Sequence, residues 1–103
     1  MLTLLVLFVV DGDTFHANSH KIRLWGIDAP EVSTYEGVEA KEFLTLLVKD
    51  KPVTCQQVDT DGYGREVSRC YVEGQDIACL LVGSGHAVDW PHFSYGYYKE
   101  CQE

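Results

Sequence analysis

Residues 2–25, LTLLVLFVVDGDTFHANSHKIRLW, decide the fold. Leu2–Val10 is almost entirely apolar, which predicts a buried strand. Asp13–Ala17 continues or follows that strand, Ala17–His20 has the composition of a turn, and Lys21–Trp25 resumes as a strand. Strands that follow one another through short turns predict a meander, because a parallel sheet would need strand–helix–strand order.

The run Leu2–Val10 has a second interpretation as a targeting segment. A secretory leader carries a basic start and a small-residue cleavage site, and this run instead passes directly into Asp11. It is also much shorter than the roughly 20 residues that span a bilayer. We therefore expect a strand here and no membrane partner.

The remaining chain predicts a helix, a strand pair, a second helix and a short strand. The helix runs from Gly37 to about Lys49, because apolar residues recur there at helical spacing, and Pro52 stops it. The later elements are strands over Val53–Val58 and Glu66–Val72, a helix capped by Asp76 with Ile77, Leu80 and Leu81 facing inward and Gly85 as its stop, and a strand within His86–Asp89.

This order of elements predicts a single domain over residues 1–103, mainly β with helices (α+β). A small closed barrel of five strands, of the OB type, with two to three accessory helices accommodates it best. The aromatic tail from Trp90 to Tyr98 is followed by what reads as the start of a truncated C-terminal helix.

The net charge argues against a nucleic-acid partner. Lys and Arg number 8 against 16 Asp and Glu, which gives a formal charge of −8, whereas nucleic-acid backbones are usually bound by basic patches. Either no polyanion binds, or the acids gather around a cation while a few arginines contact phosphate. The second interpretation predicts weak affinity for long DNA.

The four cysteines have no metal-binding spacing. Cys55 and Cys70 flank the turn near Gly62 almost symmetrically, so an antiparallel hairpin would set them side by side. They form either a cross-strand disulfide, which implies a secreted or periplasmic protein, or two reduced thiols in the core. Cys79 and Cys101 are a possible second bridge.

Two carboxylates stand where strands end. Asp13 and Asp28 each lie beside a predicted strand, where neighbouring strands bring them together. Oxygen ligands select a hard cation such as Ca²⁺ or Mg²⁺, and a sparse site of this kind leaves positions open for water and phosphate. The alternative is an ordinary Asp-Gly-Asp-Thr turn whose acids are solvated.

Three further residues fit phosphodiester chemistry. Glu31, three residues after Asp28, is a candidate general base for water, and the alternative is a surface glutamate. Arg23, on the opposite face of its strand from the apolar residues, and Arg65, in the Asp61–Arg65 turn, offer guanidinium forks to a phosphate. For both arginines the alternative is a structural salt bridge.

Aromatic residues offer faces on which bases could stack. They are Tyr63, Trp90, Tyr95, Tyr97 and Tyr98. For those in the tail, packing into the core or over a pocket is an equal alternative. The four histidines form no constellation.

Four motifs in order resemble the staphylococcal-nuclease-like (thermonuclease) family. They are Val9–Phe15 (VVDGDTF), Ile22–Glu31 (IRLWGIDAPE), Asp61–Arg65 (DGYGR) and Leu81–Ala87 (LVGSGHA). The resemblance implies an OB-fold barrel and a Ca²⁺-dependent nuclease acting on DNA and RNA, with Mg²⁺ a weaker choice. It also implies cleavage of the P–O5′ bond to leave 3′-phosphates.

The resemblance also implies roles for individual residues. Asp13, Asp28 and the carbonyl of Ala29 would ligate Ca²⁺, with Asp11 just outside the direct ligands. Three residues would be catalytic: Glu31 would activate or position the attacking water, and Arg23 and Arg65 would hold the phosphate and stabilise its transition state. Tyr63 would contact the nucleotide of a single-stranded or locally melted substrate. No obligate protein partner is evident.

The competing hypothesis is a non-catalytic OB-fold module that binds nucleic acid or protein. The complete set of Asp13, Arg23, Asp28, Glu31 and Arg65 favours the enzyme, because a pure binder has no need of all five. The chain departs from the family in Val32–Glu36, which has no lysine, and at Gly62, which adds no positive charge.

Overall fold

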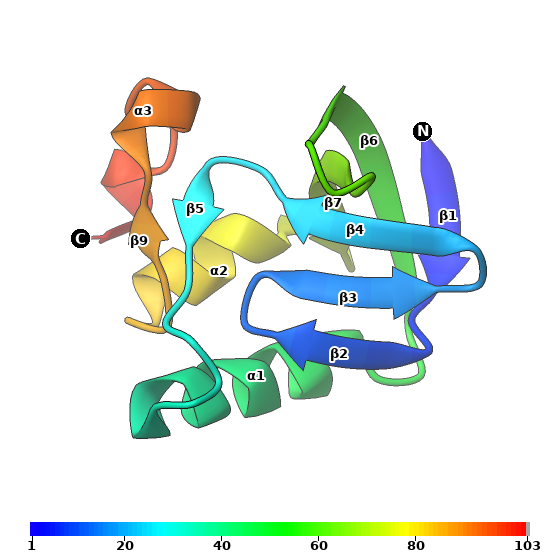
Figure 1. The fold of residues 1–103 in the computed structure, drawn as a ribbon, viewed down its shortest axis with the longest axis horizontal. Helices are drawn as coiled ribbons and strands as arrows, with labels where there is room; N and C mark the ends of the chain where they lie inside the picture. Colours follow the sequence, from blue (N-terminus) through cyan, green and yellow to red (C-terminus); the bar gives the residue numbers. More distant parts are fainter. Residues whose placement is uncertain (103) are drawn as a thin grey trace.

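The computed structural model describes residues 1–102 and has a curled β-sheet with helices packed against it (Figure 1). The mixture of strands and helices confirms the predicted α+β class. In chain order the elements are β1 (Leu2–Leu5), β2 (Phe8–Asp11), β3 (Thr14–Ala17), β4 (His20–Leu24), β5 (Ile27–Asp28), α1 (Tyr35–Val48), β6 (Pro52–Thr60), β7 (Glu66–Val72), β8 (Gln75–Asp76), α2 (Ile77–Gly83), β9 (Val88–Asp89), α3 (Pro91–Ser94) and the 3₁₀ helix η1 (Lys99–Gln102).

The main sheet returns on itself. Its strand order is β1-β6-β7-β4-β3-β2, with β8 paired to β7. The two end strands, β1 and β2, are consecutive in the chain, so one bent stretch pairs with β6 at one end and with β3 at the other. If β1 and β2 are counted as one bent strand, they and β3, β4, β6 and β7 make up the five strands of an OB-like barrel. β4 and β7 pair in parallel, and β5 forms a separate two-stranded sheet with β9.

The prediction of one buried strand over Leu2–Val10 was wrong. The stretch forms two strands separated by residues 6–7, and only Leu4 and Val9 are buried. Leu5 and Phe8 are exposed. Successive side chains alternate between the two faces of a strand, so a strand with one face toward the core buries only alternate residues.

Helix α1 begins two residues earlier than predicted. Thr34 caps it, because its Oγ1 accepts a hydrogen bond of 3.0 Å from the backbone N of Gly37. Its buried residues lie on one stripe, as the periodicity predicts, and include Ala40, Leu44 and Val48. In α2 the predicted cap, Asp76, is confirmed, whereas Leu80 is only half-buried.

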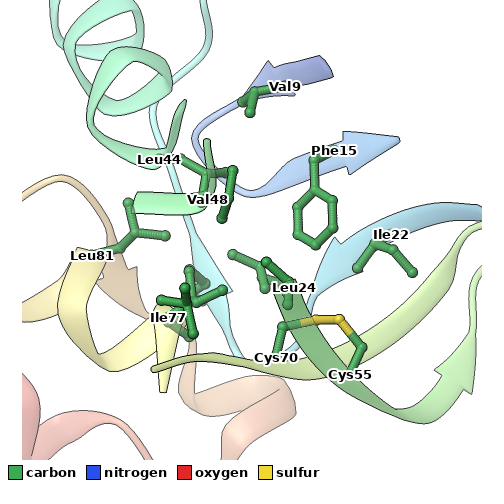
Figure 2. Close-up of a cluster of buried hydrophobic side chains, with 14 of the residues drawn as sticks. Val9, Phe15, Ile22, Leu24, Leu44, Val48, Cys55, Cys70, Ile77 and Leu81 are labelled. Atoms are coloured by element: carbon green, nitrogen blue, oxygen red, sulfur yellow. A yellow bond between two sulfur atoms is a disulfide. The ribbon is translucent and has the colours of Figure 1, made fainter. Parts of the chain in front are cut away.

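The core fills the space between the curled sheet and the two longer helices (Figure 2). Phe15, Ile22 and Leu24 point into it from β3 and β4, and α1 and α2 contribute Leu44 and Leu81. Of the two alternatives for Cys55 and Cys70, the structure has the cross-strand disulfide, which lies in this core where the two residues are directly opposite on β6 and β7.

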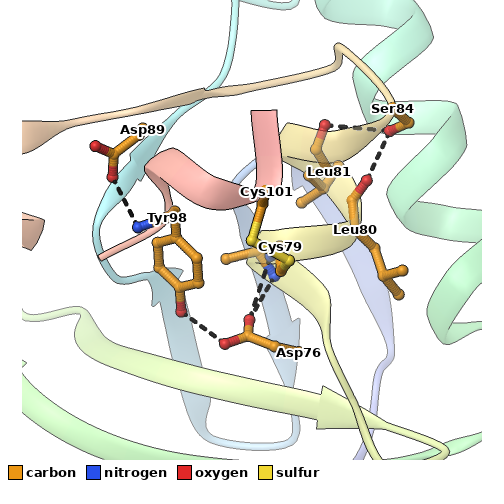
Figure 3. Close-up of a disulfide and its surroundings, with 9 residues drawn as sticks. Asp76, Cys79, Leu80, Leu81, Ser84, Asp89, Tyr98 and Cys101 are labelled. Atoms are coloured by element: carbon orange, nitrogen blue, oxygen red, sulfur yellow. Dashed lines mark hydrogen bonds between the residues drawn. A yellow bond between two sulfur atoms is a disulfide. The ribbon is translucent and has the colours of Figure 1, made fainter. Parts of the chain in front are cut away.

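A second disulfide, Cys79–Cys101, ties the tail to α2 (Figure 3). Beside it the hydroxyl of Tyr98 donates a hydrogen bond of 2.9 Å to Asp76, and Tyr98 is 1% exposed, so it is a core residue and not a stacking face.

Two disulfides are typical of an extracellular or periplasmic protein. Among the helices of residues 1–102, none has the length and apolarity to cross a bilayer.

Candidate active site

Asp13 is a buried carboxylate at the start of the barrel meander. It lies in the turn between β2 and β3 and is 6% exposed. The hydroxyl of Thr14 donates to its Oδ1 (3.1 Å), and the backbone N of Ala29 donates to its Oδ2 (2.9 Å). Gly12 lets this turn pack closely against Ala29 and α1, because a Cβ at residue 12 would lie 2.7 Å from the Cβ of Ala40 and 2.8 Å from that of Ala29.

Arg23 joins the two predicted cation ligands. Its Nη2 lies 3.4 Å from Oδ2 of Asp13 and 3.8 Å from Oδ1 of Asp28, and its Nη1 donates to the carbonyl of Leu24. The guanidinium leaves β4 on the face opposite the buried Ile22 and Leu24, as the alternation predicts. Since both carboxylates reach the same nitrogen atom, they border one small volume.

The electrostatics of Asp13 suit a cation ligand. Burial raises the pKa of its carboxyl to about 7, a hydrogen bond with Asp11 adds to that rise, and the charge of Arg23 opposes it. Asp11 stands beside the ligand pair, where its Oδ1 accepts a hydrogen bond from the backbone N of Asp13. A bound cation would offset the cost of keeping this buried carboxylate charged.

The donor set fits a hard cation that takes part of its coordination from water and substrate. Asp13 and Asp28 offer oxygen, which Ca²⁺ and Mg²⁺ prefer. Within residues 1–102 no three His, Cys, Asp or Glu residues cluster as a closed metal site would require. The arrangement is therefore unsuited to a structural zinc site.

Arg65 reaches the same cluster from the turn between β6 and β7. Its Nε donates to Oδ2 of Asp61 at 2.6 Å, and its Nη1 lies 3.4 Å from Oγ1 of Thr14. Oδ1 of Asp61 accepts from the backbone N of Tyr63 and of Arg65, which fixes the turn. Burial acts to raise the pKa of Asp61, but the hydrogen bonds from Arg65 outweigh it and the pKa lies below its usual range.

A cavity of about 290 Å³ opens beside the two arginines. Its aromatic lining comes from Trp25, Tyr63, Trp90 and Phe93. The guanidinium carbon of Arg23 lies 5.8 Å from the ring centroid of Trp90, and that of Arg65 lies 5.3 Å from the ring of Tyr63. A pocket lined by two cations and by aromatic rings is suited to a phosphate joined to a flat ring.

Some of the cavity-lining residues carry no clear signal in the sequence. The sequence predicts either stacking or packing for Trp90, and the structure places it at the cavity. Phe93 and Asp59 also line the cavity, and neither is among the residues that the sequence indicates. The signal for Phe93 was its position three residues after Trp90, which puts both rings on one side of the turn of α3, with centroids 4.5 Å apart.

Glu31 is the predicted site residue that the structure leaves apart. It is exposed, and no hydrogen bond or ion pair joins its carboxylate to the other site residues within the described chain. Its backbone is nevertheless fixed, because its carbonyl accepts hydrogen bonds from the N and Oγ1 of Thr34. A Cβ at Gly37 would lie 1.7 Å from that carbonyl oxygen, so only glycine permits this contact with α1.

Comparison with known proteins identifies the family of the chain. The family described as staphylococcal nuclease homologue matches residues 21–103. The chain belongs to this family, and the resemblance inferred from the four motifs is thereby confirmed.

Individual relatives carry nuclease names and one other name. The chain is 37% identical over 84 residues to a probable staphylococcal-like nuclease, CAN1, of Oryza sativa, covering 82% of this chain and 25% of that one. It is 34% identical over 104 residues to an uncharacterized endonuclease of Haemophilus influenzae, covering 95% and 58%. It is 32% identical over 107 residues to the succinoglycan biosynthesis protein ExoI of Rhizobium meliloti, covering 92% and 56%. The chain thus spans little more than half the length of these two bacterial relatives.

Proposed function

We propose that this protein is a Ca²⁺-dependent nuclease that hydrolyses phosphodiester bonds of DNA or RNA at the P–O5′ bond and leaves 3′-phosphates. The observation that carries the proposal is the bridge from Asp13 through Arg23 to Asp28, with Arg65 joined to Asp13 through Thr14 at the mouth of an aromatic cavity. Membership of the nuclease family and the nuclease names of several relatives support it.

In this proposal Asp13, Asp28 and the carbonyl of Ala29 hold the cation. When bound, Ca²⁺ would withdraw charge from the phosphate oxygens and so favour attack at phosphorus. We choose Ca²⁺ over Mg²⁺ from the resemblance to the family, and because two carboxylates and a carbonyl leave coordination positions that a flexible Ca²⁺ sphere fills with water. Asp11 helps to fix Asp13, because its Oδ1 accepts a hydrogen bond from the backbone N of Asp13.

The two arginines bind the phosphate, and Glu31 acts on the attacking water. Arg23 and Arg65 approach from β4 and from the β6–β7 turn, so their N–H groups can bind different oxygens of one phosphate and stabilise the charge that grows there. Glu31 is exposed on a fixed backbone, which leaves its carboxylate able to turn toward a bound substrate and orient or deprotonate the attacking water.

The aromatic lining favours a single-stranded or locally melted substrate. Tyr63, Trp90 and Phe93 offer faces to a base, and a base in an intact duplex has its own faces occupied by its neighbours. The net charge of −8 disfavours long polyanions, so stacking and two arginines supply the affinity in place of a basic track. The two disulfides support secretion or a periplasmic location.

The test is digestion of a 5′-labelled single-stranded oligonucleotide, with the product ends mapped. We expect fragments ending in 3′-phosphate when Ca²⁺ is present, and fragments that form about 10²–10³-fold more slowly with the Arg65→Ala variant. Fragments with 3′-hydroxyl ends would contradict the assigned bond. Binding of the oligonucleotide without any fragment would instead support the competing non-catalytic module.

A further inference from the structure

Thr14 occupies the junction between the acidic and the basic halves of the site. It is the first residue of β3, follows Asp13 directly, and is the cross-strand partner of Arg23 on β4. The residue is 3% exposed. Its hydroxyl lies 3.1 Å from Oδ1 of Asp13 and 3.4 Å from Nη1 of Arg65. No other side chain of the described residues hydrogen-bonds to both of these groups.

The direction of both hydrogen bonds follows from the chemistry of the groups. A guanidinium can only donate, so the hydroxyl accepts from Arg65 and its single proton goes to the carboxylate of Asp13. Asp61 holds Arg65 at a second point, through Nε. With Nε and Nη1 both engaged, the guanidinium has a fixed plane, and Nη2 remains for a ligand.

The geometry points to Thr14 as a positioning residue: its hydroxyl fixes the guanidinium of Arg65 relative to Asp13, so that one phosphate meets both the cation site and Arg65. The consequence for turnover rests on the proposed nuclease function, whereas the effect on phosphate binding does not. A preorganised donor stabilises developing charge without first having to reorient, so loss of the hydroxyl acts mainly on kcat.

The test is a double-mutant cycle between Thr14 and Arg65, read as kcat and KM on a short single-stranded oligonucleotide with Ca²⁺. We expect Thr14→Val to lower kcat about tenfold, the scale of one hydrogen bond to a charged group, with a smaller change in KM. Thr14→Ser keeps the hydroxyl and restores most of the rate. In the Arg65→Ala background, Thr14→Val has no further effect.

Two controls make the result specific. Thr54→Val removes a threonine hydroxyl from β6 that bonds only Thr3, and it leaves kcat unchanged. Thermal unfolding shows whether Thr14→Val is folded, and if it is not, Thr14→Ala takes its place in the cycle. Equal losses of kcat in the Arg65 and the Arg65→Ala backgrounds, or no loss at all, would overturn the inference.

A binding measurement separates this inference from the proposed function. Thymidine 5′-monophosphate has no phosphodiester bond, and its affinity can be measured in chelator. We expect Thr14→Val to weaken this binding severalfold in the parent and not in the Arg65→Ala background. If the parent cleaves nothing yet this coupling is present, the nuclease proposal fails and the role of Thr14 holds. Identical weakening in both backgrounds would refute the role of Thr14.

Discussion

The guanidinium of Arg23 lies 3.4 Å from the carboxylate of Asp13, a residue that reaches it from the preceding turn of the meander. The same nitrogen lies 3.8 Å from Asp28, which follows on β5. Arginine stays charged at every physiological pH, so Arg23 is a permanent counter-ion for both acids. The group proposed to bind phosphate therefore also holds the cation ligands together.

Replacing Arg23 tests this double role. Arg23→Met removes the phosphate contact and leaves Asp13 beside Asp28 without a counter-ion, and we expect kcat to fall by roughly 10²–10³, as for loss of one preorganised donor. Lys21→Met, an exposed change on the same strand, is the matched control and keeps its rate. Rates within a factor of two for both variants would remove Arg23 from the mechanism.

The raised pKa of Asp13 predicts a pH-dependent cost to stability in chelator. The carboxyl has a pKa of about 7 in the folded protein and an ordinary value of 3.8 when unfolded. Between these values the folded state binds a proton that the unfolded state does not, so this group lowers stability as pH rises from about 4 to 7. Asp13→Asn should raise the free energy of unfolding at pH 8 by roughly 1–3 kcal/mol, and by much less at pH 4.5.

The measurement is urea unfolding at the two pH values, with Glu39→Gln on the exposed face of α1 as the control. Glu39→Gln should change stability little at either pH, because its carboxylate is solvated. If Asp13→Asn destabilises the protein at pH 8 as much as at pH 4.5, Asp13 does not carry the burial cost described here.

The cavity predicts which aromatic residues bind nucleotide. Trp90→Leu removes a ring that lines the cavity, and we expect it to weaken binding of a single-stranded oligonucleotide by about 1–3 kcal/mol. Tyr95→Leu is the matched control, because Tyr95 is 91% exposed and lies outside the cavity lining. Fluorescence anisotropy in chelator measures both affinities. Equal losses for the two variants would place the base elsewhere.

The two disulfides have different surroundings and predict different responses to reductant. Cys55–Cys70 is buried in the core, whereas Cys79 and Cys101 are half-buried at the surface. Mild reductant should therefore open Cys79–Cys101 first, as mass spectrometry of alkylated thiols would show. Cys79→Ser with Cys101→Ser should cost about 2–4 kcal/mol of stability, in line with closure of a loop of this size. Alkylation of Cys55 before Cys79 would contradict this order.

Much of the site could be predicted because its residues lie close to strand ends in a meander. Neighbouring strands β3 and β4 bring Asp13 and Arg23 together through local pairing, and Asp28 follows within a few residues. The Asp76 cap of α2 and the facing positions of Cys55 and Cys70 are equally local, since each depends on a turn or a hairpin register.

What could not be predicted depends on contacts between distant parts of the chain. The parallel pairing of β4 with β7 brings Arg65 to Thr14, and no local pattern in the sequence encodes it. Phe93 lines the cavity only because the tail folds back toward Arg23, with the backbone N of Trp90 bonded to the carbonyl of Gly26. The break within residues 2–10 depends on the curvature of the curled sheet, which composition does not reveal.

The most direct test of the central claim is the initial rate of oligonucleotide cleavage as Ca²⁺ is titrated into chelator-treated protein, for the parent and for Asp13→Asn with Asp28→Asn. Our account predicts a rate that rises from zero and saturates with Ca²⁺ in the parent, and no cleavage at any Ca²⁺ concentration in the double variant. Cleavage that is unchanged in chelator, or that survives the loss of both carboxylates, would contradict it.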